Sequence, residues 1–368
     1  MCAAASSAPS SVPTSTTAHS SPPGTRRTAA VLVTGAGGEM GHGLLKALSD
    51  RYDGTGTAVV AMDIRELEPA QRALCRDAFV GDVCDTALLE RLLAMYEIME
   101  IYHLAALLST RGEYSPETAH TVNVTGTLNL LRLAAEQARS HGARVKFVFP
   151  SSIAVYGLPD LATKNSVPPL REDQFCEPIT MYGCNKLYGE HLGRYYARHY
   201  RLLAKDRMDR PIDFRCIRFP GIISADTVPS GGTSDYAPEM VHAAAAGRPY
   251  SCFVRPDARI PFMTMPDAID AIVRLAAADG TRLTRCVYNI TSFSPSASEI
   301  AELVREFFPA SEVSFQPDAA RQGIVDSWPA EVDDSAARRD WGYRPEHTLR
   351  SAFESYLVPR VMAHYRGA

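Results

Sequence analysis

The 368-residue sequence lacks the features that mark several large classes of protein. No apolar run approaches the roughly 18 residues that a membrane-spanning helix requires. Lysine and arginine number 38 against 42 aspartates and glutamates, so the net charge is −4 and there is no excess of positive charge to hold a nucleic-acid backbone. These absences argue against a membrane-spanning protein and against a general nucleic-acid binder.

Cysteine pairs at metal-ligand or redox spacing are also absent. The eight cysteines include no Cys-x-x-Cys pair, and no neighbouring histidine completes a zinc-site spacing. We therefore expect no bound metal, inert thiols and a reducing compartment. With 46% hydrophobic and 22% charged residues, the composition is that of an ordinary globular protein of one large domain or two modest ones.

Residues 1–28 lack acids and nearly all charge. They are mainly Ala, Ser, Thr and Pro, their only full charges are Arg26 and Arg27, and the first acid of the chain is Glu39. Such a segment has too little apolar surface to offset its ordering entropy, which predicts a disordered tail. The hydroxyl content and the late arginine pair also resemble an organelle transit peptide, although no Arg-rich amphipathic helix is present. Mitochondrial import and a plain tail on a cytoplasmic protein both remain open.

From residue 29 onward, short apolar runs alternate with helical patterns. AAVLVTG, AVVAMDI, AFVGDV, IYHLAA and KFVFPSS have strand signatures, and helical segments such as MGHGLLKALSDRY and LLERLLAMY lie between them. This alternation predicts right-handed βαβ crossovers and an α/β fold with a doubly wound parallel sheet. We expect one domain over residues 29–218 and a smaller lobe over 219–368, some segments of which return to the sheet.

The segment TGAGGEMG, residues 34–41, joins the first strand to the first helix. Its G-x-x-G-x-x-G spacing permits a sharp turn, a close approach of the backbone to a pyrophosphate and tight packing of helix on strand. The helix N-terminus adds free N–H groups for the phosphates. This context predicts a Rossmann dinucleotide site, and the expected contacts are Gly35, Gly38, Glu39, Met40 and Gly41.

Residues at the ends of the next strands extend the predicted cofactor site. Asp63 ends the second strand, where its carboxylate can bind an adenosine ribose and would repel a 2′-phosphate. NAD is therefore favoured over NADP, although Arg65 leaves some NADP use open. The other expected contacts are Ile64, Asp82 and Val83 near the adenine, Leu104, Ala105 and Ala106 after the fourth strand, Asn123 in the next helix, and Phe219 and Ile222 near the nicotinamide.

Tyr182 and Lys186 stand four residues apart, on one face of a helix that follows the fifth strand. An ammonium beside a phenol stabilises the phenolate and lowers the tyrosine pKa, so Tyr182 could remove a hydroxyl proton as hydride leaves carbon. Ser152 is the candidate to hydrogen-bond the reacting oxygen, with Ser151 as the alternative. The predicted catalytic residues are Tyr182, Lys186 and Ser152.

These motifs together resemble the extended short-chain dehydrogenase/reductase family, which contains dehydrogenases, sugar-nucleotide epimerases and dehydratases. Three longer strings resemble the short-chain L-threonine 3-dehydrogenases within it, namely HLAALLSTRGE, RFPGIISADTVPSGGTSDYAPEM and DSWPAEVDDSAARRDWGY. The resemblance covers nearly all of the chain after residue 28. It implies NAD⁺-dependent oxidation of L-threonine at its β-hydroxyl to 2-amino-3-oxobutanoate, and a homodimer built on the helices over 117–139 and 181–200.

Several residues are candidates for the substrate site. Ser109 could donate to a carboxylate, and Thr233, less surely Ser234 and Asp235, lies on a Gly-rich loop that could close over a small substrate. Arg218 is either a carboxylate partner or part of a structural ion pair, and Trp328 is either a lid or a core residue. The expected substrate contacts are thus Ser109, Ser152, Tyr182, Arg218, Thr233 and Trp328.

Two departures from the family pattern and two alternatives remain. Asn185 and Ser234 stand where a small Ser or Thr and a Thr are usual, which leaves individual substrate contacts open. Arg259, in RIPFMTMPDAIDAI, could hold a diphosphate and would favour a nucleotide-sugar epimerase. A non-catalytic NAD sensor is the other alternative, although the Tyr182/Lys186 pair is intact.

Overall fold

The computed structural model describes residues 27–229 and 231–366. The tail expected over residues 1–28 lies outside this range except for its last two residues. Thr28 already begins the first strand, and the Arg27 guanidinium donates to Ser140 Oγ at 2.7 Å and to Leu93 O. The described fold therefore begins two residues earlier than the sequence predicted.

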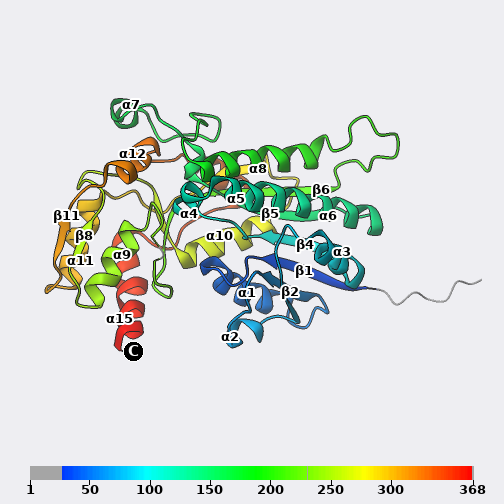
Figure 1. The fold of residues 1–368 in the computed structure, drawn as a ribbon, viewed down its shortest axis with the longest axis horizontal. Coiled ribbons are helices and arrows are strands. Elements are labelled where there is room, and N and C mark those ends of the chain that lie inside the picture. The colour runs from blue at the N-terminus through cyan, green and yellow to red at the C-terminus, as the bar shows by residue number, and fades with distance from the viewer. Residues whose placement is uncertain (1–26, 230, 367–368) are drawn as a thin grey trace, which may run out of the picture.

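A seven-stranded sheet forms the centre of the molecule (Figure 1). Its order is β10-β6-β5-β4-β1-β2-β3, and every neighbouring pair is parallel. The order of the strands changes direction at β1: β2 and β3 are added on one side of it, and β4, β5 and β6 on the other. Open α/β sheets bind ligands at such a point, beyond the carboxyl ends of the strands. The predicted doubly wound fold is confirmed. The strands are β1 (Thr28–Thr34), β2 (Ala58–Asp63), β3 (Asp77–Val80), β4 (Tyr96–His103), β5 (Val145–Ser152), β6 (Ile212–Phe219) and β10 (Val287–Asn289).

Helices cover both faces of this sheet. On one face α1 (Glu39–Tyr52), α10 (Met265–Ala277) and α13 (Ser335–Trp341) enclose a core that includes Leu44, Ile272 and Tyr288. The other face carries α3 (Thr86–Met95), α6 (Gly126–His141) and α8 (Met181–Arg198). The helix expected over 117–139 is interrupted, because a π-helical turn, η1 (Thr121–Thr125), separates α5 (Pro116–His120) from α6. A short helix, α2 (Pro69–Arg72), follows β2.

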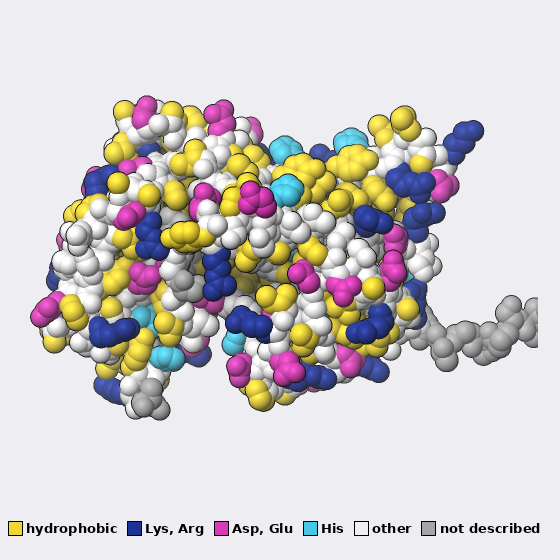
Figure 2. Space-filling view, viewed as in Figure 1, with side chains coloured by type: hydrophobic (Ala, Val, Ile, Leu, Met, Phe, Trp, Pro, Cys, Tyr) yellow, Lys and Arg dark blue, Asp and Glu magenta, His cyan; other side chains and the backbone are white. Residues whose placement is uncertain are grey.

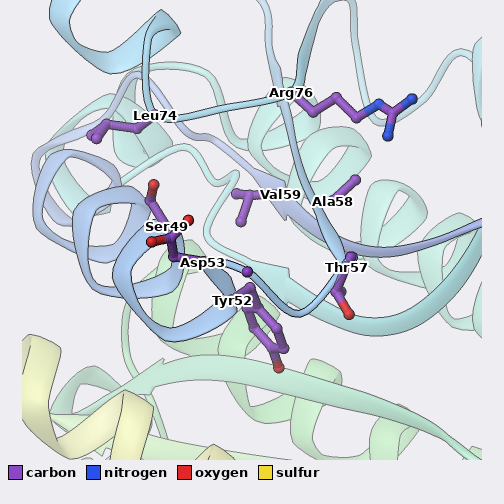
Figure 3. A pocket seen from close by; sticks show the side chains of 10 residues that line it. Ser49, Tyr52, Asp53, Thr57, Ala58, Val59, Leu74 and Arg76 are labelled. Atoms are coloured by element: carbon purple, nitrogen blue, oxygen red, sulfur yellow. The ribbon is translucent and has the colours of Figure 1, made fainter.

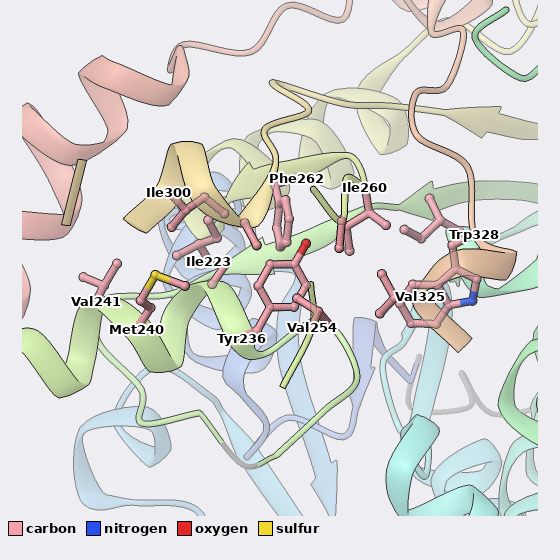
Figure 4. Packing of buried hydrophobic residues seen from close by; sticks show 14 of the residues in the cluster. Ile223, Tyr236, Met240, Val241, Val254, Ile260, Phe262, Ile300, Val325 and Trp328 are labelled. Atoms are coloured by element: carbon pink, nitrogen blue, oxygen red, sulfur yellow. The ribbon is translucent and has the colours of Figure 1, made fainter. Parts of the chain in front are cut away.

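Most of the remaining chain forms the smaller lobe around its own apolar core (Figure 4). Tyr236 and Phe262 meet edge to face there, with ring centroids 5.6 Å apart. Segments 265–277, 287–289 and 335–341 return to the sheet. The lobe contains β7 (Gly221–Ile223), β8 (Tyr250–Cys252), β9 (Phe262–Thr264), β11 (Val313–Phe315), α9 (Tyr236–Ala245), α11 (Ala297–Phe307), α12 (Ala319–Ser327), α14 (Leu349–Ser351), η3 (Ala352–Leu357) and α15 (Val358–Arg366).

Three short elements lie where the two parts meet, namely α4 (Ser109–Tyr114), η2 (Ile153–Val155) and α7 (Leu161–Ser166). Both α4 and η2 follow the carboxyl ends of central strands, β4 and β5, and so lie at the edge where a ligand is expected. Within the described residues, no helix combines the length and hydropathy needed to cross a bilayer.

Candidate active site

The glycine-rich loop follows β1 and leads directly into α1. Gly35 has φ +68°, and a Cβ there would lie 2.5 Å from the backbone nitrogen of Ala105, so this position accepts only glycine. Gly38 is the N-cap of α1, and no side chain caps that helix end. The loop therefore leaves N–H groups without a side-chain cap at a helix N-terminus, which fits the pyrophosphate of a dinucleotide.

Asp63 holds this loop in place. One carboxylate oxygen accepts from Gly37 N at 2.9 Å and the other from Arg65 N at 3.1 Å. A carboxylate has about four acceptor positions, so it can still receive ribose hydroxyls. Ile64 beside it is 67% exposed. After β3, Asp82 accepts from Cys84 N at 2.9 Å and Val83 is buried.

The residues after β4 border the same edge of the sheet. Leu104 N donates to Thr34 O at 3.0 Å, which joins the end of β4 to the end of β1. Leu104, Ala105 and Ala106 are half-buried, as is Met40 across the loop. Phe219 is buried at the end of β6 and Ile222 is half-buried in β7.

Asn123 lies in the π-helical turn, and its amide makes two hydrogen bonds with the backbone of Leu107. Its Oδ1 accepts from Leu107 N at 2.8 Å, and its Nδ2 donates to Leu107 O at 3.0 Å. The structure thus places this residue against the chain between β4 and α4 rather than in open space. It fixes the segment that leads to Ser109, and its expected contact with the cofactor stays a prediction.

The predicted catalytic residues come together at the start of α8. Tyr182 and Lys186 share one helix face, and the Lys186 Nζ lies 5.5 Å from the centroid of the Tyr182 ring. Ser152, at the end of β5, accepts from Ala154 N at 3.1 Å and lies close enough to the Tyr182 hydroxyl to act on its pKa. The helix can approach this closely because Gly183 packs on Ala154, where a Cβ would lie 2.1 Å from the carbonyl oxygen.

The chain's own groups set the protonation of this pair. Burial raises the pKa of Tyr182 above its usual range, and the hydrogen bond with Ser152 acts in the opposite direction. Burial lowers the pKa of Lys186 to about 8, opposed by the neighbouring Cys216 and Glu190. The Lys186 Nζ donates to Pro150 O at 2.7 Å. The expected lowering of the tyrosine pKa by the lysine is therefore not achieved by the protein groups alone.

Ser109 and Thr233 meet although they are 124 residues apart. The Thr233 hydroxyl donates to Ser109 Oγ at 3.2 Å, and both residues are buried. Beside them, Gly231 O accepts from Thr110 Oγ1 and from Arg321, each at 2.8 Å. Since Gly112 of α4 packs against Tyr182, with only 3.9 Å between a Cβ there and the Tyr182 backbone, this hydroxyl pair lies next to the catalytic helix.

Arg218 is buried and its guanidinium is bound by groups of the chain itself. It is 1% exposed, and its Nε and Nη2 each donate at 2.8 Å to Glu190, while its Nη1 donates to Glu172 O at 2.9 Å. Because its donors are used in these bonds, the Arg218 guanidinium fits the second of the two roles considered for it, a structural ion pair, better than the role of a substrate-carboxylate partner. The sequence reasoning did not identify Glu190, although its position four residues after Lys186 continues the catalytic face of the helix.

Two further candidates have positions that do not suit the expected roles. Trp328 is 4% exposed and packs in the lobe core with its ring beside Val325 (Figure 4), so it is a core residue rather than a lid. Arg259, the candidate diphosphate ligand, donates to Glu299 at 2.8 Å and to Ser294 O. Its charge is already paired, which weakens the epimerase alternative.

Hollows in the described part of the chain include one at each end of α1. One, of about 420 Å³, lies between α1, α10 and the lobe, with Glu39 on its wall. Glu39 is exposed, but partial loss of solvent around its carboxyl and the negative charge of Asp235 raise its pKa to about 7. The other lies at the opposite end of α1, lined by Tyr52, Thr57 and Val59 among others (Figure 3), and is therefore remote from the strand carboxyl ends.

Comparison with known proteins identifies the family. The NAD dependent epimerase/dehydratase family matches residues 31–291. The mitochondrial L-threonine 3-dehydrogenase of Bos taurus is 37% identical over 320 residues, which cover 87% of this chain and 79% of the bovine protein. Among solved structures, L-threonine dehydrogenase from Clostridium difficile superposes with a TM-score of 0.78 at 32% identity, over 92% of this chain and 99% of that one.

A monomeric L-threonine 3-dehydrogenase from a metagenome is similar to the same degree, with a TM-score of 0.78, 34% identity and coverage of 91% and 99% of the two chains. The chain thus belongs to the NAD dependent epimerase/dehydratase family. The predictions of the family, of NAD as cofactor and of an NAD-dependent enzyme are confirmed.

Proposed function

We propose that this chain oxidises L-threonine at its β-hydroxyl, yielding 2-amino-3-oxobutanoate and NADH. The observation that carries the proposal is the pair Ser109–Thr233, held beside Tyr182 by α4. Similarity to L-threonine dehydrogenases along nearly the whole chain supports it. With Arg259 paired to Glu299, no specific observation favours sugar-nucleotide chemistry.

The base in this proposal is Tyr182, with Ser152 orienting the reacting hydroxyl. When bound, NAD⁺ supplies the hydride acceptor and a positive charge near the phenol. That charge would favour the phenolate and oppose the effect of burial, which raises the pKa of Tyr182. Lys186 would hold the nicotinamide ribose and stabilise the phenolate. The cofactor phosphates would rest on residues 35–41, and Asp63 would receive the adenosine ribose.

The substrate carboxylate would be bound by hydroxyl groups. Ser109 and Thr233 each carry one O–H that can turn toward an anion, and Thr110 and Gly231 fix the two segments that carry them. Arg218 and Trp328 are not part of this proposed site, because both are buried in other contacts. In this proposal the substrate would bind between the two lobes, which are divided at residues 218 and 219, because Ser109 belongs to the first lobe and Thr233 to the second.

We also propose a homodimer formed through α6 and α8. Tyr188 and Tyr195 on α8 are 50% and 45% exposed, and hydrophobic side chains gather along the upper edge of the molecule over this helix (Figure 2). Light scattering should give twice the chain mass of 40.1 kDa. A single-chain mass would place the protein with the monomeric relative. Mitochondrial import of the protein, directed by residues 1–28, of which 1–26 lie outside the described residues, is a proposal for cell fractionation to test.

The function is tested by mixing the purified protein with NAD⁺ and L-threonine and following NADH absorbance. We expect turnover that depends on threonine, and a Tyr182→Phe variant that loses at least about 100-fold in kcat while it still binds NAD⁺. Interconversion of UDP-sugars without any threonine-dependent NADH would overturn the proposal in favour of an epimerase. Near wild-type turnover by Tyr182→Phe would show that the base is another group.

A further inference from the structure

Behind the proposed catalytic pair lies a carboxylate with no contact with solvent. Glu190 has a fully buried side chain and continues the face of α8 that carries Tyr182 and Lys186, one helical turn further on. Burial of a charged carboxylate is strongly unfavourable unless partners compensate for it. Its presence beneath Lys186 therefore requires an explanation.

Three elements of the site converge on this carboxylate. Ser151 of β5 donates to Glu190 Oε1 at 2.7 Å, and Arg218 of β6 binds both oxygens at 2.8 Å. Ser151 is the immediate neighbour of Ser152, and Arg218 that of Phe219. Glu190 thus joins α8 to the two strand ends that carry proposed substrate and cofactor contacts.

The same carboxylate acts on the Lys186 amine. Burial lowers the pKa of Lys186, and Cys216 and the negative charge of Glu190 oppose that shift. Other ionisable groups surround this cluster. They are Tyr182 and Arg194 on α8, Cys216 and Arg218 on β6, His103 at the end of β4, Tyr156 after η2, and Cys176 in the segment before α8. Glu190 is the carboxylate in this set, and together with Cys216 it favours the ammonium form of Lys186.

We propose that Glu190 is a positioning residue, which fixes the ends of β5 and β6 against α8 and stabilises the ammonium form of Lys186. This assignment rests on the proposed function for its catalytic meaning, because the ammonium is needed beside the Tyr182 phenolate. The titration of Lys186 itself can be measured without any turnover.

The lysine content of the chain makes that measurement practical. Only five lysines occur, Lys46, Lys146, Lys164, Lys186 and Lys205, so [ε-¹³C]lysine labelling gives few NMR signals, and Lys186→Arg identifies the relevant one. In Glu190→Gln, which keeps the side-chain shape but removes the charge, the Lys186 midpoint should fall by about one pH unit. The alkaline limb of the kcat profile should fall with it.

A second variant with the opposite expected sign tests the same pair. Arg218→Gln removes the compensating positive charge, so the Lys186 midpoint should rise by about as much. Asp213→Asn is the matched control for Glu190→Gln. It also removes a carboxylate that pairs with a buried arginine of β6, in this case Arg215, but Asp213 lies near the other end of the strand. It should leave the Lys186 midpoint unchanged.

Opposite shifts in the two variants would support the proposal. If either folded variant lost activity at every pH with the Lys186 midpoint unmoved, Glu190 would be a structural residue only, and the proposal would be wrong. If the midpoints shifted as expected but the wild-type protein produced no NADH from threonine, the proposed function would fail while the role of Glu190 stood.

Discussion

Two regions of this molecule each contain a buried lysine, and the two lysines are alike in almost every local property. Lys186 and Lys164 are each 4% exposed. They donate to the backbone carbonyls of Pro150 at 2.7 Å and Val325 at 2.8 Å, and burial lowers the pKa of each to about 8.

Their neighbours differ. Lys186 faces the Tyr182 ring and Glu190 at the strand carboxyl ends, whereas Lys164 joins α7 to α12, near the Arg255–Asp326 ion pair. Depth and a lowered pKa are therefore the same in a region suited to chemistry and in one that supports the smaller lobe. A perturbed lysine becomes a functional candidate only through what lies beside it.

The largest effect should separate the two lysines by activity. Lys186→Met removes the ammonium beside Tyr182 and should lower kcat by at least about 100-fold. Lys164→Met, the matched control, should keep kcat within about threefold while it changes the melting temperature. Steady-state kinetics and thermal unfolding of both variants would measure this. The comparison breaks if folded Lys164→Met loses as much activity as Lys186→Met.

The next effect concerns the stability that Lys164 costs. Its pKa is about 8 in the folded chain against a usual 10.5, so the unfolded state binds more protons between these pH values. This group therefore makes stability rise as pH rises through that window, with its full cost present below it. The free energy of unfolding of the wild type minus that of Lys164→Met should increase by up to about 3 kcal/mol across the window. Denaturant titrations at several pH values measure it, and a flat difference would show that the amine is not desolvated.

A smaller effect should distinguish two buried serines, one in each region. Ser109 is 8% exposed and bonded to Thr233, and Ser327 is 5% exposed and donates to Ile324 O. A hydrogen bond to a charged group contributes about 1.5 kcal/mol or more, so Ser109→Ala should raise the KM for threonine about tenfold. Ser327→Ala should leave KM unchanged and affect stability only. An unchanged KM in Ser109→Ala would remove that residue from the proposed carboxylate site.

The parts of this molecule that the sequence predicts well are those whose chemistry is local. The loop at Gly35 and the pair Tyr182/Lys186 are defined by spacings of a few residues, and the alternating strand and helix patterns fix the sheet. The helix boundary at Met181 and the strand end at Ser152 lie where the motifs indicate.

The parts that the sequence predicted poorly depend on distant partners. Arg218 forms its ion pair with Glu190, which is 28 residues away in the sequence, and Arg259 forms its own with Glu299, which is 40 residues away. Trp328 is hydrophobic enough for either a lid or a core, and only the packing of α12 on the lobe decides between them. The π-helical turn at Asn123 leaves no signature in hydrophobic spacing. In each case the missing information is the identity of a long-range neighbour.

The π-helical turn at Asn123 limits which side chains can replace this residue. The Asn123 amide accepts one hydrogen bond from the Leu107 backbone and donates one to it, which is the pattern that two paired residues of a β-sheet form. Aspartate would offer only acceptors at neutral pH, and glutamine would carry the same amide one methylene too far. Of these three side chains, only asparagine keeps both hydrogen bonds with Leu107, whether or not this amide meets cofactor or substrate.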